Sequence, residues 1–176
     1  MQTFNGTHGT SLRRAENIQA TGFRATELGR AGKGAYFWDY RKDSVFAVEL
    51  AKGWFDFMKR TSCFKDETNP DGAVVFGTFD AHHDDVLDCT DQDVLEEIAL
   101  SLRPLPNVTD KEIHAAYEMV VRNTEKVLER PMIVVKANVA PPAKMKFGLR
   151  NVLGNPAIFV VRTQLEQIKV RFEPFK

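Results

Sequence analysis

The sequence has no apolar run long enough to cross a membrane. Its longest apolar runs, such as residues 73–76 and 158–161, have the length of a strand, whereas a transmembrane helix needs about 20 apolar residues. Residues 1–5 combine neither a basic start nor an apolar stretch, so we expect no secretion signal and a cytoplasmic location. We therefore predict no membrane partner.

The sequence also has few cysteines and no net charge. Cys63 and Cys89 are the only cysteines, which is too few for a disulfide scaffold. Because we expect no secretion signal, we expect free thiols in a reducing cytoplasm. The two cysteines also lack the partner His and Asp pattern of a thiol protease, so we do not expect that activity. The 24 basic side chains balance 24 acidic ones, whereas proteins that grip nucleic acid nonspecifically are usually basic. A nucleic-acid substrate would therefore have to bind through a local patch of the surface.

The sequence does carry the apolar content of one domain and an irregular mixture of helix and strand patterns. Its 176 residues fit a single domain, residues 1–176. Apolar residues with helical spacing predict helices near residues 12–21, 44–58, 94–102 and 110–128. Apolar runs predict strands at residues 35–38, 73–79, 132–139, 157–161 and 168–172. Because these elements do not alternate regularly, we predict an α+β fold.

Local signals predict where several helices begin and end. Thr10-Ser11 precedes the first helix as the cap candidate, and Gly22 suits its left-handed end. Asp43 is expected to cap the second helix. Thr109 and Glu112 have the spacing of a capping box at the start of the longest helix.

Several short motifs follow one another near the beginning of the chain. They are His8-Gly9-Thr10-Ser11, Ala15-Glu16-Asn17-Ile18, Gly22-Phe23-Arg24, Gly32-Lys33-Gly34-Ala35-Tyr36-Phe37, and Ser44, eight residues beyond Tyr36. The glycines at 29, 32 and 34 do not follow a strand, so they form no dinucleotide-binding fingerprint. In this order and spacing, however, the motifs resemble the NAD-binding half of the poly(ADP-ribose) polymerase and diphtheria-toxin group of ADP-ribosyltransferases. Residues 155–161 resemble the strand that carries the third signature residue of that family.

The resemblance covers residues 4–58 and 150–172 and implies a specific fold and activity. The fold would be an ADP-ribosyltransferase fold, with two packed, mostly antiparallel sheets, flanking helices and an NAD cleft between the sheets. The activity would be mono-ADP-ribosyl transfer from NAD, the co-substrate, to a macromolecular acceptor, either protein or nucleic acid. A catalytic domain of this kind is typical of a bacterial toxin or defence effector, which would imply a neutralising or regulatory partner protein.

The resemblance also assigns roles to individual residues. The backbone N–H and C=O of Gly9 would pair with the nicotinamide amide, because glycine leaves the approach open, and Ser44 would add a hydroxyl. Tyr36 would stack on the nicotinamide ring, a contact worth about 0.5–1.5 kcal/mol. His8 would bind the adenosine ribose, and Arg24 would reach the adenosine or the diphosphate.

A second aromatic covers the nicotinamide in many relatives. The matching position here is Ala47, and Phe46 is the stand-in. The whole predicted cofactor-binding set is His8, Gly9, Thr10, Arg24, Tyr36, Ser44 and Phe46.

The third signature position departs from the polymerase pattern. Where polymerising relatives have a glutamate, this chain has Ile158, which with His8 and Tyr36 makes up the predicted catalytic set. Glu166 is the nearest later carboxylate. Without a general base, a sugar hydroxyl is not activated for chain growth, so we expect transfer of single units only.

Three alternatives remain open from the sequence. The same fold could hydrolyse NAD with water as the acceptor, or bind NAD, ADP-ribose or a partner without catalysis. Transfer to the 2′-phosphate of RNA is the third, although the chain has no run of basic residues for it.

Residues 82–89 include several residue types that bind metals. They are His82, His83, Asp84, Asp85, Asp88 and Cys89. Adjacent residues at a strand end would point to opposite sides, and no second cluster has matching spacing. We therefore expect a solvated acidic loop and no metal site.

Overall fold

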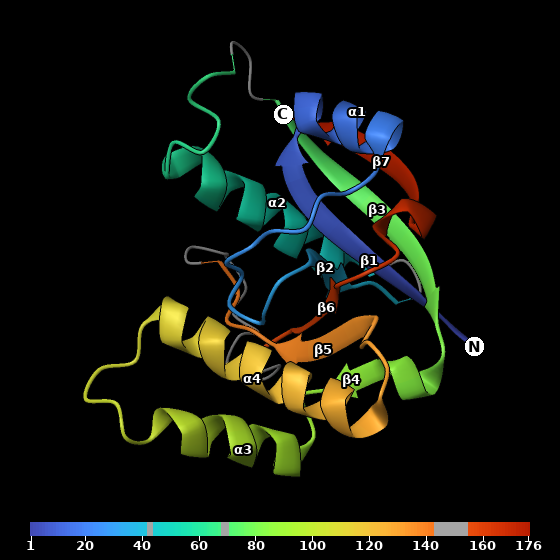
Figure 1. Cartoon of the computed structure of the whole chain (residues 1–176). Helices are drawn as coiled ribbons and strands as arrows, with labels where there is room; N and C mark the ends of the chain where they lie inside the picture. Colours follow the sequence, from blue (N-terminus) through green and yellow to red (C-terminus); the bar gives the residue numbers. More distant parts are fainter. Residues whose placement is uncertain (42–43, 68–70, 143–154) are drawn as a thin grey trace.

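The computed structural model describes residues 1–41, 44–67, 71–142 and 155–176 (Figure 1). Its strands are β1 (Gln2–Ser11), β2 (Ala35–Asp39), β3 (Gly72–Ala81), β4 (Val86–Asp88), β5 (Val134–Asn138), β6 (Ala157–Val161) and β7 (Lys169–Phe175). Its α-helices are α1 (Leu12–Thr21), α2 (Val45–Arg60), α3 (Gln92–Leu102) and α4 (Asp110–Leu128). Two short 3₁₀ helices are η1 (His83–Asp85) and η2 (Leu165–Gln167).

The strands form one seven-stranded sheet in the order β4-β5-β6-β2-β1-β3-β7. All neighbouring pairs are antiparallel except β4 and β5. The predicted α+β class is confirmed, but the prediction of two packed sheets is wrong. The reason is β2, which pairs with β6 along one edge and with β1 along the other.

The connection between β2 and β1 is short. It comprises only the pairs Gly6↔Asp39 and Thr7↔Trp38, whereas β1 pairs with β3 along all ten of its residues. The β7-β3-β1 part and the β2-β6-β5-β4 part of the sheet are therefore joined by a ladder of only two residue pairs.

The alternation of side chains along the strands creates a core on each face of the sheet. One core, which we call the α1-side core, contains Ala15 of α1 together with Phe37 and Phe159 of the sheet. The other, which we call the α2-side core, contains residues of α2, α3 and α4. Its members from those helices and from the sheet include Trp38, Leu50, Phe76, Ile98, Tyr117, Val120 and Ile158.

Most of the predicted helix ends are confirmed. The Ser11 side chain accepts a hydrogen bond from the Arg14 amide, and Gly22 follows α1 with a φ of 82°. The capping box of Thr109 is present at the start of α4. The predicted cap of α2 is wrong, because the side chain of Ser44 occupies that place; Asp43 lies outside the described residues.

The region predicted as an acidic loop has more structure than the sequence indicates. Within residues 80–93 the chain forms η1 and then β4, a short strand that pairs with the parallel β5. Strand β4 has only three residues, too few to show the alternation that predicts a strand.

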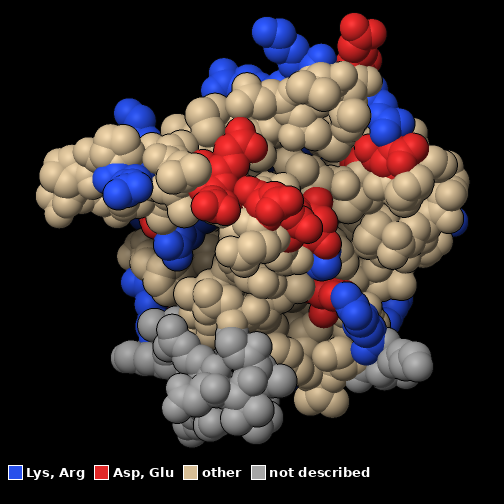
Figure 2. Space-filling model, turned by 90° about the horizontal axis from the view of Figure 1, so that it is seen from below, with Lys and Arg blue, Asp and Glu red and all other residues tan. Residues whose placement is uncertain are grey.

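The face that α3 and α4 cover carries acidic side chains near its centre, and its basic side chains lie mostly at the margins (Figure 2). Among the described residues, no helix is both long and apolar enough to cross a membrane.

Candidate functional site

Strands β1 and β2 bring His8 and Tyr36 together. The Nδ1 atom of His8 lies 3.0 Å from the carbonyl oxygen of Tyr36. A carbonyl only accepts hydrogen bonds, so Nδ1 carries the proton and donates it. In the neutral ring, Nε2 is then a hydrogen-bond acceptor.

The environment of His8 favours this neutral form. Burial lowers the pKa of His8, and the hydrogen bond to Tyr36 offsets that effect only in part. The ring of Phe23 meets the imidazole edge-on, with the two centroids 5.5 Å apart. An uncharged imidazole with an acceptor at Nε2 can bind a hydroxyl group.

The side chains of His8 and Tyr36 leave the sheet on opposite faces. His8 packs against Phe23 and Phe37 of the α1-side core, whereas Tyr36 packs against the α2-side core. Neither face of the sheet presents both side chains. A ligand that contacts both must therefore lie where the β1–β2 ladder ends, a place that we call the edge between β1 and β2.

The main chain of Gly9 points toward that edge. The amide of Tyr40 donates to the Asn5 carbonyl, 2.9 Å away, and main-chain groups alternate in direction along a strand. Alternate residues of β1 from Asn5 onward, Gly9 among them, thus direct their N–H and C=O toward β2. The described β1–β2 ladder ends at Thr7↔Trp38, so Gly9 lies beyond its last pair.

The packing of α2 explains why residue 9 is glycine. A Cβ atom on Gly9 would lie 1.7 Å from the carbonyl oxygen of Ala51 in α2. In the same contact, the Thr7 hydroxyl donates to the Ala47 carbonyl at 2.7 Å. The helix thus lies directly on β1, and Gly9 is required there with or without a ligand.

The hydroxyl end of Tyr36 is held by the glycine-rich loop. It donates to the Gly32 carbonyl at 2.5 Å and accepts from the Ala31 amide at 2.9 Å. A Cβ on Gly29 would lie 2.1 Å from the same hydroxyl. Burial raises the pKa of Tyr36, so the phenol stays protonated. The glycine-rich loop thus encloses the hydroxyl end of Tyr36.

An ion pair that the sequence did not predict fixes the same loop. Glu118 of α4 and Arg162, just after β6, form two hydrogen bonds of 2.6 and 3.1 Å. The Lys33 amide also donates to Glu118 at 2.6 Å. Burial raises the pKa of Glu118, but the bonds from Arg162 and Lys33 outweigh burial and hold this pKa below its ordinary value. Glu118 is thus a charged carboxylate at neutral pH.

His114 makes a further contact from the same helix. Its Nδ1 lies 2.7 Å from the Gly29 carbonyl. The spacing of four residues between His114 and Glu118 places both on one face of a helix. The spacing of His114 and Glu118 is the only sequence signal for this contact. Nothing in the sequence indicates that these two side chains meet residues 29–33.

The other predicted site residues occupy varied positions. Ser44 accepts from the Ala47 amide at 3.3 Å, which leaves its hydroxyl proton for another acceptor. Thr10 is buried in β1 and Arg24 is exposed after α1. Phe46 is half-buried against the α2-side core. Among the residues that the structure describes, no hydrogen bond or ring contact joins Thr10, Arg24 or Ser44 to the side chain of His8 or Tyr36.

Ile158 is a core residue of β6. It pairs with Trp38 of β2, lies in the α2-side core and is 2% exposed. Tyr36 packs on the same face, where its ladder partner is Val160. The place of Ile158 in the predicted catalytic set stays a prediction. Glu166 lies in η2, exposed to solvent.

Comparisons of the chain with protein-family models, with curated proteins and with solved structures each found no match. The structure defines the class of the protein as α+β with a single mixed sheet.

Proposed function

We propose that the protein binds NAD at the edge between β1 and β2 and transfers one ADP-ribose unit to a macromolecule. One observation carries the proposal: the main chain of Gly9 points into the end of the β1–β2 ladder, with His8 and Tyr36 on either side. The order of motifs around these residues, with its resemblance to ADP-ribosyltransferases, supports the choice of NAD.

The hydrogen-bonding groups suit two parts of NAD, the nicotinamide amide and the adenosine ribose. A carboxamide has one acceptor oxygen and donor N–H groups, which complement the N–H and C=O of Gly9. The Nε2 acceptor of neutral His8 complements a ribose hydroxyl. Tyr36 would contribute the face of its ring, because its hydroxyl is bonded to Gly32 and Ala31.

The proposed reaction breaks the glycosidic bond of NAD through an oxocarbenium-like state. Nicotinamide leaves with the bonding electrons, and a nucleophilic group of the acceptor bonds to the C1 carbon. Strand β6 has Ile158 where the polymerase pattern needs a carboxylate, and Glu118 is occupied by Arg162 and Lys33. The acceptor must therefore be a good nucleophile already, and single-unit transfer is expected.

The burial of Ile158 favours one second candidate, NAD binding without transfer. The α2-side core encloses the side chain at this position, so no group there can assist an acceptor.

The test is incubation with labelled NAD and a mixture of protein, RNA and DNA, followed by fractionation. We expect label in one macromolecular fraction, lost in Tyr36→Ala and retained in Tyr36→Phe, which keeps the ring. Arg13→Gln, an exposed change on α1, is the matched control. Free ADP-ribose alone would indicate hydrolysis, and intact NAD that is still bound would indicate the non-catalytic candidate. Unchanged NAD with no binding would contradict the proposal.

A further inference from the structure

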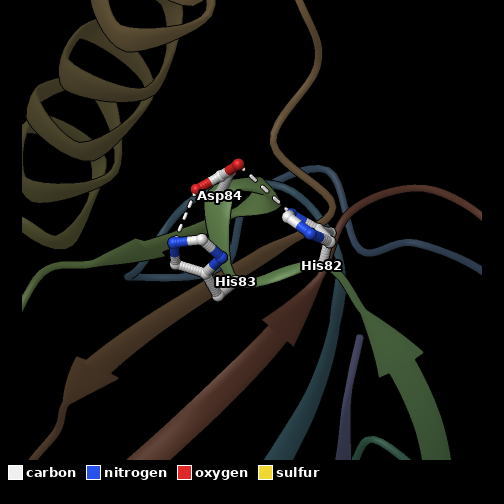
Figure 3. A group of neighbouring side chains, drawn as sticks. All are labelled: His82, His83 and Asp84. Carbon is white, nitrogen blue, oxygen red and sulfur yellow. Dashed lines mark ion pairs between the residues drawn. The ribbon is translucent and has the colours of Figure 1, made fainter.

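Three consecutive side chains meet at the end of β3, at η1 (Figure 3). The Nδ1 atom of His82 lies 3.2 Å from one carboxylate oxygen of Asp84, and Nε2 of His83 lies 2.7 Å from the other. One ligand atom from each of the three residues can be chosen so that all lie within 4.8 Å of one another. We call these three residues the His-His-Asp cluster.

The backbone explains why neighbouring side chains converge here. Strand β3 ends at Ala81, and the Asp85 amide then bonds to the His82 carbonyl at 2.9 Å, which closes a 3₁₀ turn. A strand would direct His82 and His83 to opposite sides, but the turn directs both imidazoles to one carboxylate. The geometric premise behind the prediction of a plain acidic loop is thus wrong.

The other residues that the sequence suggested do not join the cluster. Asp88 pairs with Lys136 at 2.7 Å, and Cys89 is fully buried beside it. Burial raises the pKa of Cys89 to about 12, which disfavours the thiolate that binds metals.

The turn that carries the cluster is fixed from outside. Arg130 donates to the Asp84 carbonyl at 2.9 Å and pairs with the Asp85 carboxylate at 3.3 Å. The Ile133 amide donates to the Asp85 carbonyl at 2.9 Å. Ligands on a backbone held in this way need little rearrangement to bind an ion.

The local charge permits a cation. Arg130 lies 3.6 Å from the Asp84 carboxylate and opposes a cation there, but Asp85 compensates for the guanidinium. With both imidazoles neutral, two carboxylates and one guanidinium leave one net negative charge. Both imidazoles are largely exposed, so an ion can reach them from solvent.

We propose that the His-His-Asp cluster binds a divalent transition-metal ion of the zinc type. Two imidazole nitrogens and one carboxylate oxygen are a common zinc donor set, in which water fills the remaining position. Imidazole ligands favour zinc, nickel or copper over magnesium and calcium, which prefer oxygen. The cluster follows Ala81, which pairs with Gln2 at the far end of the β1–β3 ladder from Gly9. The metal site is therefore independent of the proposed NAD site.

Calorimetric titration of zinc chloride into the whole chain tests this proposal. All proteins carry Cys63→Ser, which removes the half-exposed thiol as a competing ligand. We expect one zinc ion per chain, with binding weakened at least about tenfold in His83→Asn and in Asp84→Asn. Asp80→Asn, a neighbouring exposed carboxylate that contacts Thr3, is the matched control and should bind as the parent does.

Cobalt provides a second readout, because cobalt bound through imidazole gives visible absorption. His83→Asn and Asp84→Asn should both lose this absorption. Absence of zinc binding in the parent would overturn the proposal. Equal zinc affinity in all four proteins would overturn it too, because the ion would then be bound elsewhere. Magnesium binding as tight as that of zinc would contradict the zinc-type assignment.

Discussion

The imidazole of His8 donates to the Tyr36 carbonyl at the point where the main-chain ladder between β1 and β2 has ended. The His8 side chain thus replaces a main-chain hydrogen bond of the ladder and bonds to the Tyr36 carbonyl of β2. The main chain of Gly9, which is also on β1, points toward the same edge. This arrangement makes the end of the ladder a binding site in our account.

The lowered pKa of His8 predicts a pH dependence of stability. A folded-state pKa below the ordinary value of 6.5 means that the folded protein binds fewer protons than the unfolded chain. The contribution of His8 is thus complete above about pH 6.5 and is lost as the pH falls toward the folded-state pKa.

Urea unfolding of the wild type and of His8→Gln between pH 5 and 7.5 measures this effect. The difference in unfolding free energy between the two should shrink as the pH falls. A difference that stays constant over this range would contradict the buried, neutral state of His8.

The ion pair between Glu118 and Arg162 should contribute measurably to stability. Both side chains are mostly buried, with 18% and 12% exposed, and Glu118→Gln leaves the guanidinium without its charged partner. We expect a loss of about 1–3 kcal/mol in unfolding free energy. The control is Glu49→Gln, which removes the more exposed pair with Lys52 and should cost less than about 1 kcal/mol. Similar losses in both variants would show that burial of the pair has no effect.

Gly9→Ala tests the contact between β1 and α2. The added Cβ would overlap the Ala51 carbonyl, so α2 must move, and we expect a loss of about 3 kcal/mol or more. At Gly22, nothing lies within 4 Å of an added Cβ and φ is 82°. Gly22→Ala should therefore cost only the backbone strain, about 1–3 kcal/mol. Thermal unfolding of both proteins measures the difference, and equal stability would contradict the close approach of α2.

Ile158→Glu distinguishes a core position from a site position. Because the side chain is 2% exposed in the α2-side core, the new carboxylate should destabilise the fold by several kcal/mol. A stable variant with altered NAD turnover would place residue 158 at the ribose instead. Wild-type products should carry single ADP-ribose units by mass spectrometry, and long chains would point to another acid, with Glu166 the first to test.

The sequence predicted the elements better than their assembly. Periodicity and caps located α1, α4, β3 and β6, because these signals are local. The single sheet was missed because it depends on two residue pairs between β1 and β2, which no local pattern encodes. Likewise, Glu118 and Arg162 meet the glycine-rich loop across long sequence separations.

The site could be predicted only as a set of residues. The motifs identified His8, Gly9 and Tyr36. They did not indicate that the side chains of His8 and Tyr36 lie on opposite faces of the sheet. The His-His-Asp cluster was dismissed because strand alternation was assumed where the chain makes a 3₁₀ turn.

The amide resonance of Gly9 reports directly on whether NAD binds at the end of the β1–β2 ladder. In a protein with ¹⁵N-labelled glycine, the spectrum contains signals from the 11 glycines only. Addition of NAD should shift the Gly9 signal, and nicotinamide alone should shift it in the same direction. A Gly9 signal that stays in place at saturating NAD would contradict our account.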